Sequence, residues 1–128
     1  MNASAEEWLE FANVDLMAAE RLLEDPNLTN VVCFHAQQCL EKSLKALIES
    51  TGAIPPKTHD LVRLYGLIEE KIDMEEDILA LLNEVYIESR YPASYGLLPA
   101  GRPDTSDAEK FLSFAKETHS KITKLVIF

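Results

Sequence analysis

The sequence predicts an all-α protein, a mainly antiparallel up-and-down helical bundle of four to five helices. Apolar residues recur at every third or fourth position along most of the chain, which is the period of an amphipathic helix. Glycine occurs only four times, which argues against a β fold rich in turns. The connections between the periodic segments are mostly short, and short connections favour antiparallel neighbours.

The length and composition indicate one globular domain over residues 1–128. The chain is 47% hydrophobic and 27% charged, and a chain of 128 residues can bury a core of its own. Its net charge of −10 argues against broad binding to DNA or to an anionic membrane. A nucleotide or an RNA at a local basic patch stays compatible with that charge.

The cysteines and the N-terminus predict a cytoplasmic protein. On one helix Cys33 and Cys39 would point about 240° apart, so they cannot form a disulfide with each other. No metal-ligand spacing accompanies them, and we expect no metal and no cofactor. The first ten residues are acidic and lack the apolar run of a signal peptide. No apolar stretch approaches the ~20 residues that span a membrane.

The first two predicted helices are long. One covers about residues 5–24 and ends because Pro26 disfavours helix in the residue before it. The other covers about residues 29–50, and Gly52 suits the C-cap that follows it. Its apolar arc spans about 200°, so we expect it to be the central helix, with neighbours on two sides. The apolar face of the first helix includes Trp8, Leu9, Ala12, Leu16, Ala19 and Leu23, widened by Phe11, Val14, Ala18 and Leu22.

Three further helices are predicted. The third covers residues 59–70, with Thr58 as its N-cap. The fourth begins near Met74 and ends before Pro92. Residues 92–105 form the long irregular segment, which in a small domain is often functional. The last helix begins with a capping box, Ser106-x-x-Glu109, and runs close to the C-terminus.

One side of the second helix carries a polar stripe. Helical spacing places its members together, opposite the apolar arc: His35, Gln38, Glu41, Lys42 and Lys45. One interpretation is a solvated face on which Glu41 and Lys45 form an ordinary i,i+4 pair. The other is a polar groove in which His35, Gln38 and Lys42 donate hydrogen bonds to a phosphate or a base.

Asp15 lies among apolar positions of the first helix. An ionised carboxylate buried there is costly unless it is paired. We expect its partner to be Lys42, His35 or Arg90 on a neighbouring helix. The pair is either purely structural or the edge of a site.

The remaining candidates lie near helix ends. Asp60 suits the start of a helix, whereas His59 has no such role and is a candidate partner contact. Arg90 and Tyr91 stand where a helix stops, where they either grip a phosphate and stack a base or cap carbonyls. His119, on the inward side of the last helix, is interpreted as a core or interface histidine rather than a catalytic one. The sequence contains no glycine-rich phosphate loop, HExxH, paired CxxC or GxSxG, so no catalytic residue is predicted.

Four segments together resemble the HEPN domain. They are FANVDLMAAERLL, which contains Asp15, then FHAQQCLEKSLKAL, PPKTHDL and ESRYP, in this order and spacing. The resemblance covers about residues 5–125. It implies a compact up-and-down bundle, usually a homodimer, in a family associated with nucleotide or RNA binding. Many members work with a minimal nucleotidyltransferase as a two-component or toxin–antitoxin pair, and others are metal-independent ribonucleases.

The ribonuclease members carry an arginine followed, after four to six residues, by a histidine, and this chain has no such pair. The resemblance therefore implies a noncatalytic nucleotide-, RNA- or partner-binding module. The alternatives are a ribonuclease that acts as a dimer, with His119 and Arg102 brought together, and a purely structural dimer. The candidate binding residues are Asp15, His35, Gln38, Lys42, His59, Arg90 and Tyr91.

Overall fold

The protein is an all-α bundle, as predicted. A computed structural model describes residues 3–68, 72–89 and 103–127, and no strand occurs in these ranges. The helices are α1 (Ala3–Leu22), the 3₁₀ turn η1 (Pro26–Leu28), α2 (Thr29–Ser50), α3 (Leu61–Gly66), α4 (Glu76–Ser89) and α5 (Thr105–Ile127). Arg90, Tyr91 and Arg102 lie outside the described residues.

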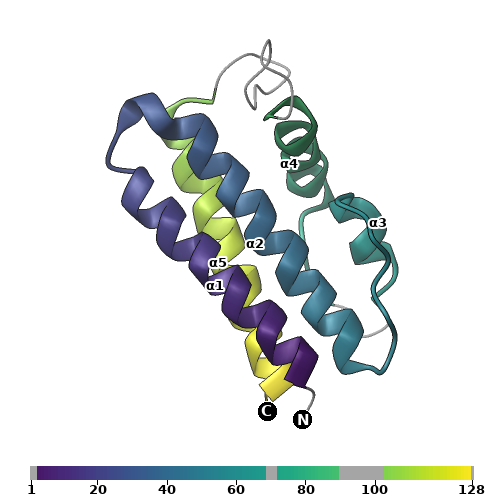
Figure 1. Cartoon of the computed structure of the whole chain (residues 1–128). Coiled ribbons are helices and arrows are strands. Elements are labelled where there is room, and N and C mark those ends of the chain that lie inside the picture. Colours follow the sequence, from purple (N-terminus) through teal and green to yellow (C-terminus); the bar gives the residue numbers. More distant parts are fainter. Residues whose placement is uncertain (1–2, 69–71, 90–102, 128) are drawn as a thin grey trace.

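The helix α2 is the centre of the bundle (Figure 1). It runs antiparallel to α1, while α5 returns antiparallel to α1, so the two ends of the chain lie at the same end of the bundle. α1 and α5 pack on one side of α2, and α3 and α4 pack on another. Fourteen of the 22 residues of α2 are buried, which confirms the prediction of a central helix with two packed sides.

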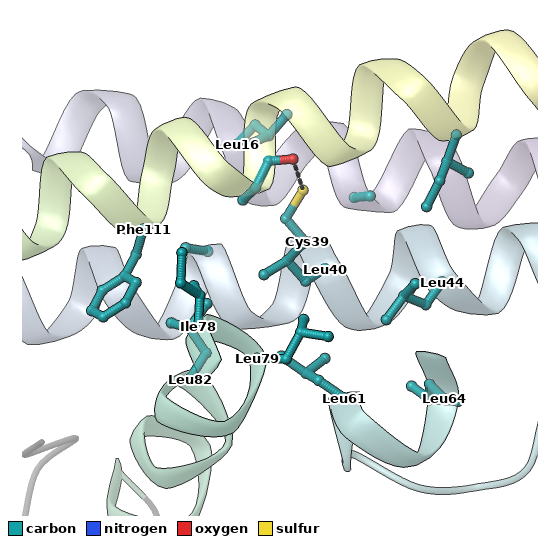
Figure 2. Close-up of a cluster of buried hydrophobic side chains, with 14 of the residues drawn as sticks. Leu16, Cys39, Leu40, Leu44, Leu61, Leu64, Ile78, Leu79, Leu82 and Phe111 are labelled. Atoms are coloured by element: carbon teal, nitrogen blue, oxygen red, sulfur yellow. Dashed lines mark hydrogen bonds between the residues drawn. The ribbon is translucent and has the colours of Figure 1, made fainter. Parts of the chain in front are cut away.

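The core joins both sides of α2 (Figure 2). Leu40 and Leu44 of α2 face α3 and α4, which contribute Leu61 and Leu79 among others. On the other side the thiol of Cys39 points to α5, with its Sγ atom 4.0 Å from the carbonyl oxygen of Ala115. Both cysteines are free and buried. At the end of α2 the C-cap is Thr51, and Gly52, predicted for that position, follows it with φ +91, the left-handed conformation that commonly ends a helix.

The start of α3 differs from the prediction. Asp60, not Thr58, is the N-cap, because its Oδ1 atom accepts from the backbone N–H groups of Val62 and Arg63 at 3.1 and 3.2 Å. The same oxygen accepts from Asn83 Nδ2 of α4 at 2.8 Å. A contact with another helix therefore selects the cap. The helix is also shorter than the predicted range 59–70, since it ends at Gly66.

The predicted capping box of α5 is wrong. Asp104 and Asp107 cap the helix reciprocally: Asp104 Oδ1 accepts from the Asp107 N–H at 2.7 Å, and Asp107 Oδ2 accepts from the Asp104 N–H at 3.0 Å. The helix therefore begins at Thr105, while Ser106 and Glu109 are exposed. Two carboxylates at the positive end of the helix dipole are electrostatically favoured over a hydroxyl and one carboxylate.

The predicted apolar face of α1 is too wide. Ala12, Leu16 and Ala19 are buried as expected, but Phe11 and Val14 are 58% and 60% exposed. The reason is geometric, because α2 and α5 cover only the opposite side of α1 in the described part of the chain.

Candidate functional site

The first part of the candidate site joins α1 to α2. Asp15 on α1 is 7% exposed. Its Oδ1 atom lies 2.9 Å from His35 Nδ1, and its Oδ2 atom accepts from Lys42 Nζ at 2.7 Å. The prediction that Asp15 pairs with His35 or Lys42 is thereby confirmed. We call these three residues the Asp15 cluster.

The second part joins α2 to the segment that leads into α3. Glu41 is 4% exposed, and its two oxygens bind different elements. Oε1 lies 2.8 Å from His59 Nδ1, and Oε2 accepts from Lys45 Nζ at 3.0 Å. We call these three residues the Glu41 cluster. Since Glu41 and Lys45 are both buried, the interpretation of the whole stripe as a solvated face is wrong for this pair.

The two clusters repeat one design. In each, a buried carboxylate holds one histidine through Nδ1 and one lysine through Nζ. A carboxylate only accepts hydrogen bonds, so each histidine donates from Nδ1 and keeps Nε2 as the second ring nitrogen. The histidine and lysine side chains are partly exposed except for Lys45, so their outer edges are available at the surface.

Glutamines extend the polar stripe. Gln38 Nε2 donates to Gln37 Oε1 at 2.6 Å, and Gln37 Nε2 donates to the carbonyl oxygen of His59 at 3.2 Å. Gln37 is fully buried and anchors the backbone that carries His59. Gln37 was not among the predicted site residues. Gln37 lies next to apolar positions of α2, which indicates that its amide is buried. A buried amide needs hydrogen-bond partners, so this position could have identified Gln37 from the sequence.

Trp8 was also missed as part of this region. Its Nε1 atom donates to Glu49 Oε2 at 3.0 Å, and Lys45 Nζ lies 5.4 Å from the ring centroid. A pocket of about 320 Å³ opens beside this ring, lined by Ser4, Glu7, Trp8, Phe11 and Glu49. Residues that are 41 positions apart in the chain give no local signal of their contact.

The electrostatics of the stripe argue against a strong anion site. The positive charges of Lys42 and Lys45 are each matched by a carboxylate within 3.0 Å. A phosphate would therefore compete with a buried carboxylate for each ammonium group. Over the described ranges, no group of three His, Cys, Asp or Glu side chains is arranged to hold a metal ion. In those same ranges no helix is both long and apolar enough for a membrane span.

The other candidates divide into two kinds. His119 is half-buried, and its Nε2 atom lies 3.1 Å from the carbonyl oxygen of Leu9, so it joins α5 to α1, in agreement with a structural rather than a catalytic histidine. Arg90 and Tyr91 lie outside the described residues, and their association with Asp15 stays a prediction. The structure thus brings together Asp15, His35 and Lys42, leaves Gln38 on the same stripe of α2, and places His59, from the segment before α3, against Glu41 of that stripe.

Comparison with known proteins agrees with this helical arrangement. The sequence matches the HEPN domain over residues 5–125, so the chain belongs to the HEPN family, as the resemblance implied. A crystal structure of TT1696 from Thermus thermophilus is similar, with a TM-score of 0.78, 30% identity, and coverage of 97% of this chain and 98% of that one. The archaeal HEPN homologue ST0689 has a TM-score of 0.69, 25% identity, and coverage of 95% and 97%. No curated protein matches the sequence significantly.

Proposed function

We propose that this HEPN protein is a noncatalytic binding module, a homodimer that works with a separate minimal nucleotidyltransferase in a toxin–antitoxin-type pair. The observation that carries the proposal is the pairing of every lysine of the polar stripe with a buried carboxylate. Such a stripe offers donors and acceptors without free positive charge. That balance suits a protein surface better than a polyphosphate chain.

The clusters also favour binding through their rigidity. His35, Lys42 and His59 are held by short contacts to carboxylates that are themselves buried. Side chains that are already ordered lose little conformational entropy when a partner binds. A partner that supplies the nucleotidyltransferase active site would add the phosphate-binding loop that this sequence lacks. Binding of a nucleotide or an RNA to the stripe, without a protein partner, is the version of the proposal that these charges support less.

The test is the affinity for the nucleotidyltransferase encoded by a neighbouring reading frame, measured by titration calorimetry. The double variant Asp15→Asn/Lys42→Gln replaces the ion pair by an amide pair of similar shape, and we expect binding to weaken about tenfold. The matched control is Glu20→Gln/Lys116→Gln, which neutralises an exposed pair 3.5 Å apart between α1 and α5. The control should bind as the wild type does. Equal binding by both variants would remove the stripe from the interface.

One observation favours a second function, the metal-independent ribonuclease. The pair formed by Glu41 and His59 has the carboxylate–histidine geometry that general acid–base catalysis uses, and the His59 side chain is 48% exposed. The missing arginine–histidine motif argues against it. Incubation of purified protein with RNA decides between the functions. Cleavage that disappears in His59→Ala would establish the ribonuclease function. Intact RNA would support the noncatalytic binding module instead.

A further inference from the structure

The outward face of α1 carries an uncovered apolar stripe. Phe11, Val14 and Met17 are 58%, 60% and 57% exposed, and they are three of the most exposed large hydrophobic residues among those described. Helical geometry continues this stripe to a charged residue at each end, with spacings of four and three that are typical of helix–helix seams. The seam consists of Glu7, Phe11, Val14, Ala18 and Arg21.

The order of residues along this seam is self-complementary. Val14 is at its midpoint, and Glu7 and Arg21 are equally distant from it, with opposite charges. Phe11 and Ala18 lie on the two sides of Val14 along the seam. We propose that a second copy of this chain covers the face, with the two α1 helices antiparallel about a two-fold axis at Val14. The inference deepens the homodimer that forms part of the proposed function and rests on that part.

The two-fold arrangement brings complementary groups together. Val14 of each copy meets its equivalent on the axis, and Phe11 of one copy packs beside it against Ala18 of the other, because both lie on the same edge of the seam. Glu7 of one copy meets Arg21 of the other at each end. The distance from Glu7 to Arg21 along one helix is about 21 Å, so the seam occupies most of α1.

The pocket beside Trp8 lies where the arginine of the other copy would arrive. It is lined by two carboxylates, those of Glu7 and Glu49, and by the rings of Trp8 and Phe11. A guanidinium group binds carboxylates and also stacks on aromatic faces. The pocket therefore has the chemistry to receive Arg21, and the two-fold axis repeats this contact at the other end of the seam.

Other occupants explain the pattern less well. A parallel pair of α1 helices would place Glu7 against Glu7 and Arg21 against Arg21, which is repulsive at both ends. An anionic membrane is disfavoured by the acidic residues Glu7 and Glu10 and by the net charge of −10. An unrelated protein would have no reason to require charges arranged symmetrically about Val14.

The first experiment measures the mass of the full chain in solution by sedimentation. We expect the wild type to be a dimer and Val14→Glu to be a monomer, because the variant places two like charges on the axis. Ile54→Glu is the matched control, since Ile54 is 89% exposed between α2 and α3, away from the seam. It should remain a dimer. Circular dichroism shows whether each variant is folded, and the exposed position of Val14 predicts full helicity.

The second experiment tests the antiparallel orientation by charge exchange. Glu7→Arg and Arg21→Glu should each weaken self-association about tenfold, because each creates like charges at both ends of the seam. The double variant Glu7→Arg/Arg21→Glu should restore it. A wild-type monomer, a Val14→Glu dimer, or a double variant weaker than both single variants would overturn the proposal. No nucleotidyltransferase is present in either assay, so failure of the wider proposed function would leave these results unchanged.

Discussion

Asp15 is the residue at which chemistry and stability are most closely linked. It lies on the buried side of α1, yet it carries a carboxylate with two partners from α2. Transfer of an ionised carboxylate from water into an apolar environment is costly unless the carboxylate is paired. The two partners are therefore needed for folding as well as for the shape of the surface. Any test of binding at this site must therefore preserve the pairing, as an amide pair does.

We predict that Lys42→Met lowers the free energy of unfolding by about 2 kcal/mol, because Asp15 loses its closer partner while staying buried. Adding Asp15→Asn should recover most of the loss, since the unpaired charge is then gone. Urea denaturation measures both values. The comparison is Lys116→Met in an exposed ion pair, which should cost less than ~1 kcal/mol. Equal losses for Lys42→Met and Lys116→Met would mean that Asp15 is well hydrated.

At the scale of elements, α3 shows how a short helix depends on its neighbours. It contains only the six residues Leu61–Gly66, too few for stability in isolation. Asp60 caps it and also binds Asn83 of α4, whose Oδ1 atom accepts from the Leu61 N–H at 2.8 Å. The two side chains thus attach the first turn of α3 to α4.

Asp60→Ala should destabilise the protein by about 1–2 kcal/mol, the upper range for loss of an N-cap, because the contact with Asn83 is lost too. Thr58→Ala tests the position that local sequence rules select. Its hydroxyl accepts only the Asp60 N–H at 3.2 Å, so we expect a smaller loss. Thermal unfolding compares the two variants. A larger loss of stability for Thr58→Ala than for Asp60→Ala would show that Thr58 is the N-cap, as the sequence predicted.

At the scale of the whole molecule, the two thiols report on the integrity of the bundle. Burial raises the pKa of Cys33 and of Cys39 to about 12 from an ordinary value of 9.0. Thiolate is the reactive form, so both thiols should resist alkylation near neutral pH while the protein is folded. Rapid modification in the native state, as fast as in urea, would show that the core opens easily.

The same shift predicts a loss of stability in alkali. Above pH 9.0 the thiols of the unfolded chain release protons, while the folded chain keeps them until about pH 12. The unfolded state then binds fewer protons, so the free energy of unfolding falls as pH rises through this window. Denaturation at a series of pH values from neutral to alkaline measures it. Cys33→Ala/Cys39→Ala should show a shallower decline than the wild type does.

Local patterns predicted the helices well because they depend on neighbours three or four residues apart. The apolar period located the five α-helices of the described residues, and the breadth of the apolar arc identified α2 as central. The same local reasoning identified Asp15 as a carboxylate in need of a partner and named two groups that bind it. The resemblance of the sequence to the HEPN domain was confirmed over residues 5–125.

Contacts between distant residues decided the rest. Asn83 selects Asp60 as the cap of α3, and Trp8 binds Glu49 across 41 positions of sequence. Whether an apolar residue of α1 is core or surface depends on which sides α2 and α5 cover, so Leu16 is buried whereas Val14 is exposed. The sequence by itself determined the helices, because their period is local. The tertiary structure decided caps, buried pairs and open faces, because each requires two elements placed in space.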